Sequence, residues 1–197
     1  MSLPKGLSAA RLSTGLALGR RIRQLAAMIE RHADQDGQRS IAYYSPCGTY
    51  RYGLERIWGE GPALLFVMLN PSTATEEKND PTIERCQRRA IQLGFGTLKI
   101  ANLFAFRATL PTDLRKADDP EGPENAALLG QWSGKAQMTI AGWGTHGALL
   151  GQGTRVAPLL NGDVRHLGLT KDGHPRHPLY VSYATKPTAW PKEARYV

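Results

Sequence analysis

The chain has few of the features that mark membrane and secreted proteins. Its 197 residues contain no run approaching the ~20 consecutive apolar residues that a membrane-spanning helix needs. The arginine-rich N-terminal region lacks the apolar core of a signal peptide, so none is expected. The two cysteines, Cys47 and Cys86, provide neither a disulfide framework nor a Cys-His zinc cluster. We therefore expect a cytoplasmic protein with no membrane partner.

Several patterns that carry catalytic chemistry are also missing. No pair of carboxylates stands in the polar loops, which argues against two-metal and ordinary glycosidase chemistry. The phosphate-binding pattern G-x-x-x-x-G-K-[ST] and the nucleophile elbow G-x-S-x-G are absent. Residues 142–147 have the spacing G-x-G-x-x-G, but no acidic residue ends the next strand about 20 residues later. We therefore predict neither a metal site nor a cofactor.

The basic charge of the chain favours an anionic partner. A formal net charge of +8 is typical of proteins that bind DNA, RNA or nucleotides, although solubility alone also explains it. Apolar residues recur at three- or four-residue steps over residues 8–33, which predicts a basic amphipathic helix. Residues 34–38 are interpreted as a linker. We therefore predict a helix and linker over residues 1–40 and one domain over residues 41–197, and the oligomeric state stays open.

The rest of the chain alternates predicted strands and helices. A β-hairpin is expected over residues 41–52, because turn residues separate two aromatic-rich strands. Asp80 is expected to cap a helix whose first residue is Pro81. The other predicted elements are strands over residues 64–70, 97–103, 138–141 and 164–169, and helices over residues 81–94, over 123–132 and up to about 160. This alternation predicts an α/β fold, namely a three-layer α/β/α domain with a mostly parallel central sheet of about four strands, to which the N-terminal helix and the small hairpin are appended.

Polar loops follow all four of these predicted strands, at residues 70–75, 102–109, 142–146 and 171–177. Right-handed crossovers would bring these loops to one edge of a parallel sheet, where open α/β sheets bind ligands. The side chains predicted to surround one cavity are Asn70, Asn102, Trp143 and His174. Capped turns are the alternative, because Asn, Ser and Thr side chains also satisfy backbone groups in turns.

Three histidines in these loops are candidates for catalysis. His146, His174 and His177 lack the carboxylate partners of a metal site, so a general acid or an anion-stabilising role is favoured. The alternative is a surface loop that Pro175 and Pro178 stiffen, with incidental histidines.

From Cys47 to Tyr180 the chain resembles an uncharacterised family, the domain of unknown function numbered 1643. The motifs that carry the resemblance are Cys47-Gly-x-Tyr-Arg-Tyr52, Met68-Leu-Asn-Pro-Ser-Thr-Ala74, Asp80-Pro-Thr82, Asn102-Leu-Phe-Ala-x-Arg-Ala-Thr109 and Lys171-Asp-Gly-His-Pro-Arg-His-Pro178. They cover about two thirds of the chain in the expected order. This resemblance implies no established activity.

A more distant resemblance is to the uracil-DNA glycosylase superfamily. The segments that carry it are Leu69-Asn-Pro-Ser72, Ile100-Ala-Asn102, Ala141-Gly-Trp-Gly144, His174-Pro175 and Pro178-Leu179. The resemblance implies that Asn70 positions the attacking water, that Asn102 reads the edge of the base and that His174 stabilises the departing base anion. The aromatic residue that stacks on the base in that superfamily is absent here, so Phe104 or Phe106 would have to replace it.

We therefore predict binding and processing of a nucleic-acid base or nucleotide, most concretely hydrolysis of an N-glycosidic bond. The alternatives are a hydrolase of free nucleotides or nucleosides and a nucleic-acid-binding accessory protein without catalysis. For a nucleic-acid partner, arginines from residues 11–31 or Arg85, Arg88 and Arg89 should border the cavity. The predicted catalytic residues are Asn70, His174 and His177. The predicted substrate-binding residues are Pro71, Ser72, Thr73, Asn102, Phe104, Phe106, Arg107, Trp143, Arg176 and Leu179.

Overall fold

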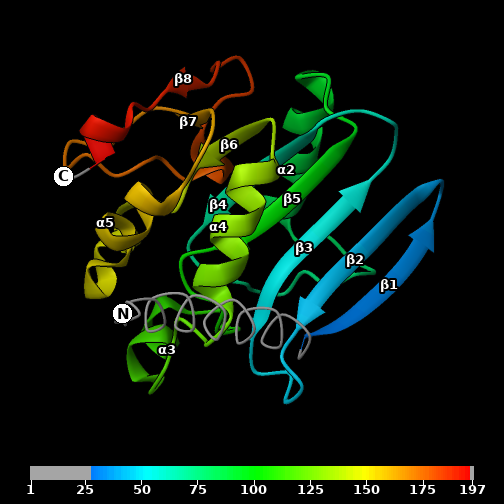
Figure 1. Ribbon diagram of the computed structural model, residues 1–197, viewed down its shortest axis with the longest axis horizontal. Coiled ribbons are helices and arrows are strands. Elements are labelled where there is room, and N and C mark those ends of the chain that lie inside the picture. The colour runs from blue at the N-terminus through cyan, green and yellow to red at the C-terminus, as the bar shows by residue number, and fades with distance from the viewer. Residues whose placement is uncertain (1–27, 196–197) are drawn as a thin grey trace, which may run out of the picture.

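The computed structural model describes residues 28–195, which form an eight-stranded sheet with helices on both faces (Figure 1). The strands are β1 (Ile29–Gln35), β2 (Gln38–Tyr44), β3 (Arg51–Ile57), β4 (Ala63–Met68), β5 (Thr97–Asn102), β6 (Met138–Ala141), β7 (Val164–His166) and β8 (Thr188–Ala189). The α-helices are α2 (Pro81–Gln92), α3 (Pro111–Lys116), α4 (Asn125–Lys135) and α5 (Gln152–Val156). Shorter 3₁₀ helices are η1 (Thr145–Gly151), η2 (Ala157–Leu159), η3 (Pro178–Tyr180) and η4 (Lys192–Arg195).

The sheet is mixed, and its strands follow the order β1-β2-β3-β5-β4-β6-β7-β8. The pairs β1–β2, β2–β3, β3–β5 and β7–β8 are antiparallel, whereas β4 runs parallel to β5 and β6, and β6 parallel to β7. The prediction of a mostly parallel, glycosylase-like three-layer sheet of about four strands is therefore wrong.

The error has a physical cause in the strands that the sequence pattern did not reveal. Strand β1 is exposed along most of its length, so it has no buried face to impose an alternation of apolar and polar residues. The hairpin of β2 and β3 was expected as an appendage, yet β3 pairs with β5 at Leu54 and Ile100 and is fully part of the sheet.

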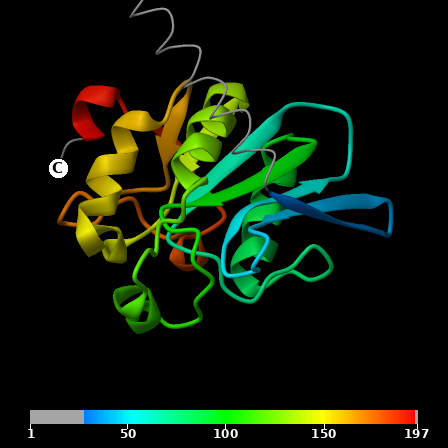
Figure 2. The same cartoon turned by 60° about the horizontal axis from the view of Figure 1, so that its bottom comes forward.

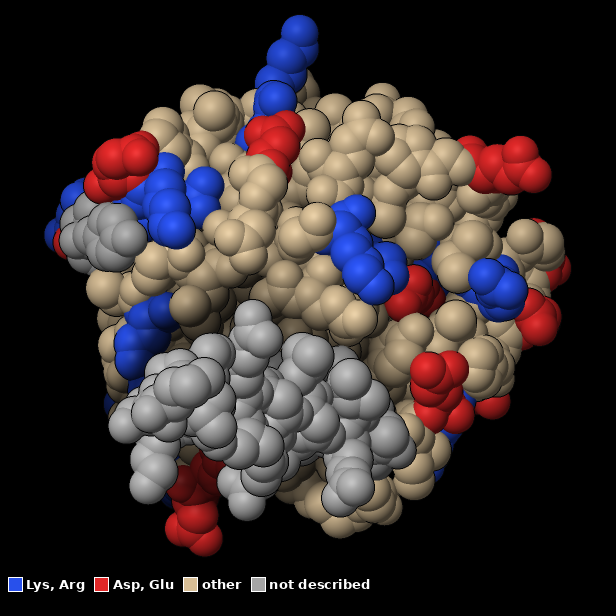
Figure 3. Space-filling model, viewed as in Figure 1, with Lys and Arg blue, Asp and Glu red and all other residues tan. Residues whose placement is uncertain are grey.

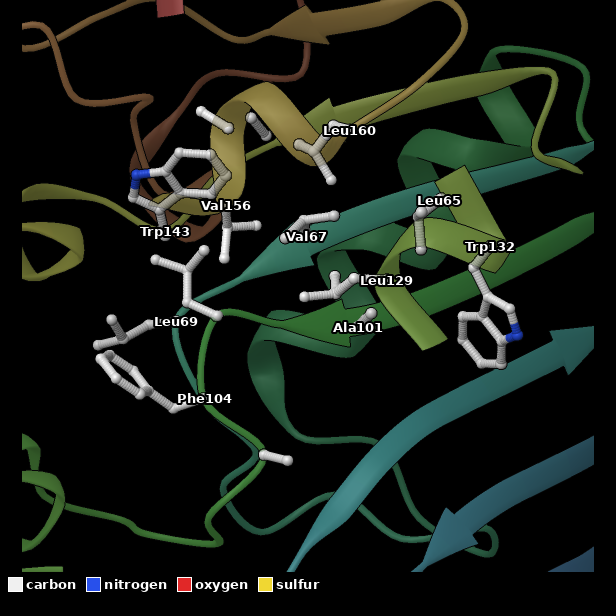
Figure 4. Packing of buried hydrophobic residues seen from close by; sticks show 14 of the residues in the cluster. Leu65, Val67, Leu69, Ala101, Phe104, Leu129, Trp132, Trp143, Val156 and Leu160 are labelled. Atoms are coloured by element: carbon white, nitrogen blue, oxygen red, sulfur yellow. The ribbon is translucent and has the colours of Figure 1, made fainter. Parts of the chain in front are cut away.

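The central strand β4 is buried on both of its faces. Residues 64–67 are fully buried, and alternate side chains enter two separate hydrophobic clusters. Helix α2 covers one cluster, and α4 with α5 covers the other, on the opposite side of the sheet (Figure 2). In the second cluster Leu65 and Val67 lie near Leu129 of α4 and Val156 of α5 (Figure 4). Burial on both faces explains the unbroken apolar run.

Helix α2 begins as its sequence predicts. The Asp80 carboxylate accepts hydrogen bonds from the backbone N–H groups of Thr82 and Ile83, both at 2.9 Å, and Pro81 is the first helical residue. Gly94 follows the helix with a φ of 81°, a left-handed conformation that glycine adopts without strain. The predicted helix start and stop are therefore confirmed.

The helix predicted over residues 8–33 is wrong where it can be compared. Residues 29–33 belong to strand β1, and the predicted linker at residues 34–38 contains the turn between β1 and β2. The remainder of that predicted helix lies outside the described residues. No helix in the described part of the chain is long and apolar enough to cross a membrane.

Candidate ligand-binding cavity

A cavity of about 650 Å³ lies at the C-terminal ends of β4 and β5, on the face of the sheet that α2 covers. The connection from β4 to β5 runs through α2 on this face, whereas the connection from β5 to β6 runs through α4 on the other. The chain therefore passes from β4 to β5 on one side of β4 and then crosses to β6 on its other side. In open α/β sheets this arrangement opens a crevice for ligands beyond the strand ends.

Strand alternation brings two asparagines to the same cavity. Met68 and Ile100 form part of its inner wall and belong to the cluster beneath α2. Because side chains two residues apart point to the same face of a strand, Asn70 and Asn102 follow them into the cavity.

The structure brings together some of the predicted site residues and not others. Those that line the cavity are Asn70, Ser72, Asn102, Trp143, Arg176, His177 and Leu179. Those outside its lining are Pro71, Thr73, Phe104, Phe106, Arg107 and His174. The roles assigned to the lining residues stay predictions.

The two phenylalanines proposed as stacking platforms lie elsewhere. Phe104 is fully buried in the hydrophobic cluster on the α4 face, near Leu69 (Figure 4). Phe106 packs edge-on against Tyr50 with ring centroids 6.3 Å apart. A residue in a loop next to a strand end can pack in the hydrophobic core or line the site. Its position in the sequence does not show which.

The cavity contains His177 instead of His174. His174 closes a tight loop, in which its carbonyl accepts from the Thr170 N–H at 2.8 Å and its own N–H donates to Thr170 Oγ1 at 3.1 Å. His177 Nδ1 accepts a hydrogen bond from the Leu179 N–H at 3.4 Å. Burial lowers the pKa of His177, although the Asp80 carboxylate opposes this shift. A neutral imidazole that accepts at Nδ1 carries its proton on Nε2, which makes Nε2 a donor.

Asn70 has one of its polar atoms left for a ligand. Its Nδ2 donates to the carbonyls of Pro71 at 3.0 Å and Ala108 at 2.6 Å, which uses both amide hydrogens. These bonds hold the side chain in one orientation. Oδ1, an acceptor, is the atom that a water or a ligand can use.

Asn102 presents the opposite polarity. It ends β5 with 2% of its surface exposed, and its Nδ2 has no hydrogen-bond partner among the described residues. Leaving a buried donor unpaired costs about 1–3 kcal/mol, and such exceptions in folded proteins call for an explanation. A ligand in the cavity that offers an acceptor supplies one.

Sequence reasoning did not assign a site role to every residue that lines the cavity, and Arg51 and Tyr180 are two of those it missed. Arg51 lies in the predicted hairpin, to which no site role was assigned, and only 2% of its surface is exposed. Tyr180 is 83% exposed, and its ring centroid lies 5.8 Å from that of His177. An exposed aromatic ring beside a cavity is typical of a ligand-binding residue. Only the fold shows that Tyr180 lies beside this cavity.

Two arginines of α2 stabilise the cavity wall. Arg89 donates to the carbonyls of Ser182 and Thr185, both at 2.8 Å, and Arg85 donates to the carbonyl of Pro178 at 2.9 Å. Burial lowers the pKa of Arg89. Neither arginine lines the cavity, so the predicted border of Arg85, Arg88 and Arg89 for a nucleic-acid partner is not found there. Their bonds instead fix the segment that carries Tyr180.

On the visible part of the face in Figure 3, the charges do not mark a nucleic-acid site. On the face that α4 and α5 cover, lysines and arginines are interspersed with acidic side chains (Figure 3). Within residues 28–195, no group of three or more His, Cys, Asp and Glu side chains could hold a metal ion. Cys47 and Cys86 are both free.

The fold and the cavity define an α/β protein with a candidate site at the carboxyl ends of its parallel strands. The family described as "Protein of unknown function (DUF1643)" matches residues 51–179, more than half of the chain, and the chain belongs to this family. No curated protein and no solved structure matches the chain. The likeness to uracil-DNA glycosylases therefore has no support beyond the motifs.

The depressed pKa of His177 predicts a loss of stability in acid. Between the ordinary histidine pKa, about 6.5, and the lower folded value, the unfolded chain binds a proton that the folded chain does not. Stability should therefore fall as the pH decreases through this window. In urea unfolding between pH 7.5 and 4, His177→Gln should show a shallower decrease than the parent. His166, whose pKa burial also lowers, provides the control. His166→Gln should remove only the part of the acid-induced loss of stability that His166 causes and leave the part that His177 causes. An unchanged pH profile for His177→Gln would contradict the assigned protonation state.

Proposed function

We propose that the cavity binds a nucleobase or nucleotide and supports hydrolysis of an N-glycosidic bond. The unpaired Nδ2 of Asn102 at the inner wall is the observation that carries the proposal. A planar base edge offers carbonyl oxygens and ring nitrogens as acceptors, and base-processing enzymes recognise a base by hydrogen bonds to its edge in an enclosed pocket. The side chains of Met68 and Ile100 provide apolar surroundings for a heterocycle.

The lining supplies the groups that hydrolysis needs. Asn70 Oδ1 can accept a hydrogen bond from a water whose oxygen bonds to the sugar carbon as the bond between that carbon and the base nitrogen breaks. The proton that the water loses ends on the departing base or in solvent. His177 Nε2–H can donate to the base as negative charge develops on it. Tyr180 offers a ring for stacking at the place that Phe104 and Phe106 do not occupy.

A free nucleotide or nucleoside is the substrate that the lining favours over a nucleic acid. Arg51 and Arg176 are the cations among the described lining residues, and no lysine occurs there. Binding to a nucleic-acid backbone normally draws on several lysines and arginines. The choice between the two substrates follows from the experiment below.

Purified protein should be incubated with free nucleosides and nucleotides and with oligonucleotides that carry varied modified bases, and the released base measured by chromatography. We expect base release, with His177→Gln about a hundredfold or more slower at similar substrate affinity, because a donor to developing charge acts mainly in the transition state. The matched control is His174→Gln, in the same loop but outside the lining, which should retain the parent rate.

Each outcome of this experiment selects one function. Release from oligonucleotides alone would indicate a nucleic-acid substrate, whereas release from free compounds alone would indicate a small-molecule hydrolase. Binding of a base without release would indicate a non-catalytic accessory protein. If no nucleobase compound binds or reacts, the proposal is wrong.

A further inference from the structure

A β-bulge directs Arg51 into the cavity. Tyr43 pairs with Gly53, but the next residue of β2, Tyr44, pairs with Arg51, so Tyr52 is an extra residue in β3. Without this extra residue, strand alternation would place Arg51 on the face opposite Leu54. With it, Arg51 shares the α2 face with Leu54, and its side chain reaches the cavity wall. Bulges next to functional sites commonly redirect a side chain in this way.

The guanidinium of Arg51 is short of partners for its degree of burial. Its Nη1 donates to the carbonyl of Ala74, but its Nε has no hydrogen-bond partner, and no carboxylate in the described part of the chain lies within 4.0 Å. Arg56, five residues further along β3, donates through all three of its nitrogens. The surrounding polar groups therefore satisfy the guanidinium of Arg56, whereas those around Arg51 leave its Nε without an acceptor.

The surroundings leave the charge of Arg51 poorly compensated. Burial lowers the pKa of Arg51 to about 10, and the nearby cations Arg107 and Arg56 act in the same direction. The group is still positively charged at neutral pH. Asp80 favours the charge, but its carboxylate Oδ1 already caps α2 through two backbone N–H groups. A buried charge without a close counter-ion is costly, and proteins normally pair it.

We propose that Arg51 is the anion subsite of the cavity and that the ligand pairs it with an anionic oxygen group. This inference rests on the proposed function for the rest of the ligand, because Asn102 and Arg51 line the same cavity. Two groups of a nucleotide have this chemistry, namely its phosphate and the ionised oxygen of a departing base. Either would accept from Nε and from a terminal nitrogen of the guanidinium at once, a geometry that suits arginine better than lysine.

Calorimetric titration of the parent with nucleosides, their 5′-monophosphates, free bases and inorganic phosphate tests the subsite. If the phosphate pairs with Arg51, the monophosphate should bind about ten- to a hundredfold more tightly than the nucleoside, and Arg51→Met should remove that difference. If the ionised base pairs with Arg51, binding of the free base should strengthen as pH rises through its own pKa, and Arg51→Met should remove this dependence. Arg51→Lys should retain part of either effect. The matched control is Arg88→Met, on the exposed surface of α2.

The outcomes separate the subsite from the proposed function. Binding of inorganic phosphate that depends on Arg51, with no contribution from any base, would keep the subsite and contradict the nucleobase proposal. Equal binding of nucleoside and monophosphate, no pH dependence for the free base and no effect of Arg51→Met or Arg51→Lys would keep the nucleobase proposal and overturn the subsite. If Arg51→Met does not fold, Arg51→Lys and a thermal-shift titration of the parent with phosphate decide: a phosphate-dependent rise in Tm that Arg51→Lys diminishes supports the subsite, and no rise overturns it.

Discussion

Replacing Asn102 by leucine is expected to stabilise the protein and to weaken ligand binding. The Nδ2 of Asn102 is buried without a partner at the cavity wall, so an apolar side chain of similar size removes an uncompensated polar group. We expect the free energy of unfolding to rise by about 1–2 kcal/mol and the affinity for a nucleobase compound to fall at least tenfold. Urea unfolding and calorimetric titration measure the two effects.

Asn125 is the matched control, because it is another fully buried asparagine with the opposite bonding. Its Nδ2 donates to the carbonyls of Asn102 at 2.9 Å and Leu103 at 3.0 Å. Asn125→Leu should therefore lower the free energy of unfolding by about 2–4 kcal/mol. A destabilising Asn102→Leu would show that Asn102 has a structural partner and would remove the main support for the base-binding site.

Replacing Arg89 by methionine is expected to lower the free energy of unfolding by about 2–4 kcal/mol. Arg89 is buried, and its two bonds at 2.8 Å satisfy the carbonyls of Ser182 and Thr185. Bonds from a charged donor contribute about 1.5–3 kcal/mol each, and the relief of burying the charge offsets part of their loss. Because the same segment carries Leu179 and Tyr180 of the cavity wall, ligand affinity should also weaken. Urea unfolding and titration of the variant measure both effects.

Arg88 is the natural comparison for Arg89. Arg88 directly precedes Arg89 in α2. Its side chain is exposed, and its Nε lies 2.7 Å from Oε1 of Glu84. Surface ion pairs of this kind contribute little, so Arg88→Met should leave stability and binding close to those of the parent. Equal effects of the two substitutions would mean that α2 needs the charge of its arginines and not the contacts of Arg89.

The sequence predicted those elements whose surroundings can be inferred from their own residues. Residues 64–67 form an unbroken apolar run because both faces of β4 are buried, and Asp80-Pro81 starts α2 through interactions within one turn. The exposed strand β1 has no such signature, and the pairing of β3 with β5 joins residues 40 or more positions apart. Local patterns do not contain the direction or the partner of a strand, so the mixed sheet was missed.

The same distinction applies to the site. Asn70 and Asn102 were predicted to meet because each follows a strand, and the parallel pairing of β4 with β5 brings both to the cavity. Phe104 was predicted to line the site but joined the core, whereas Arg51, which had no predicted site role, reached the cavity. The bulge at Tyr52 decides the second case, and a single extra residue in a strand reverses which face every following side chain takes.

The sequence by itself determined the buried strand β4, the capped start of α2 and the polar loops that follow the parallel strands. These features depend on burial and on hydrogen bonds between residues close in the chain. Only the tertiary structure decided that the sheet has eight strands, that His177 and not His174 faces the cavity, and that Arg51 and Tyr180 line it. These outcomes depend on strand pairing, on a bulge and on the bonds of Arg85 and Arg89 to a distant segment, whose energies arise between residues that the sequence separates.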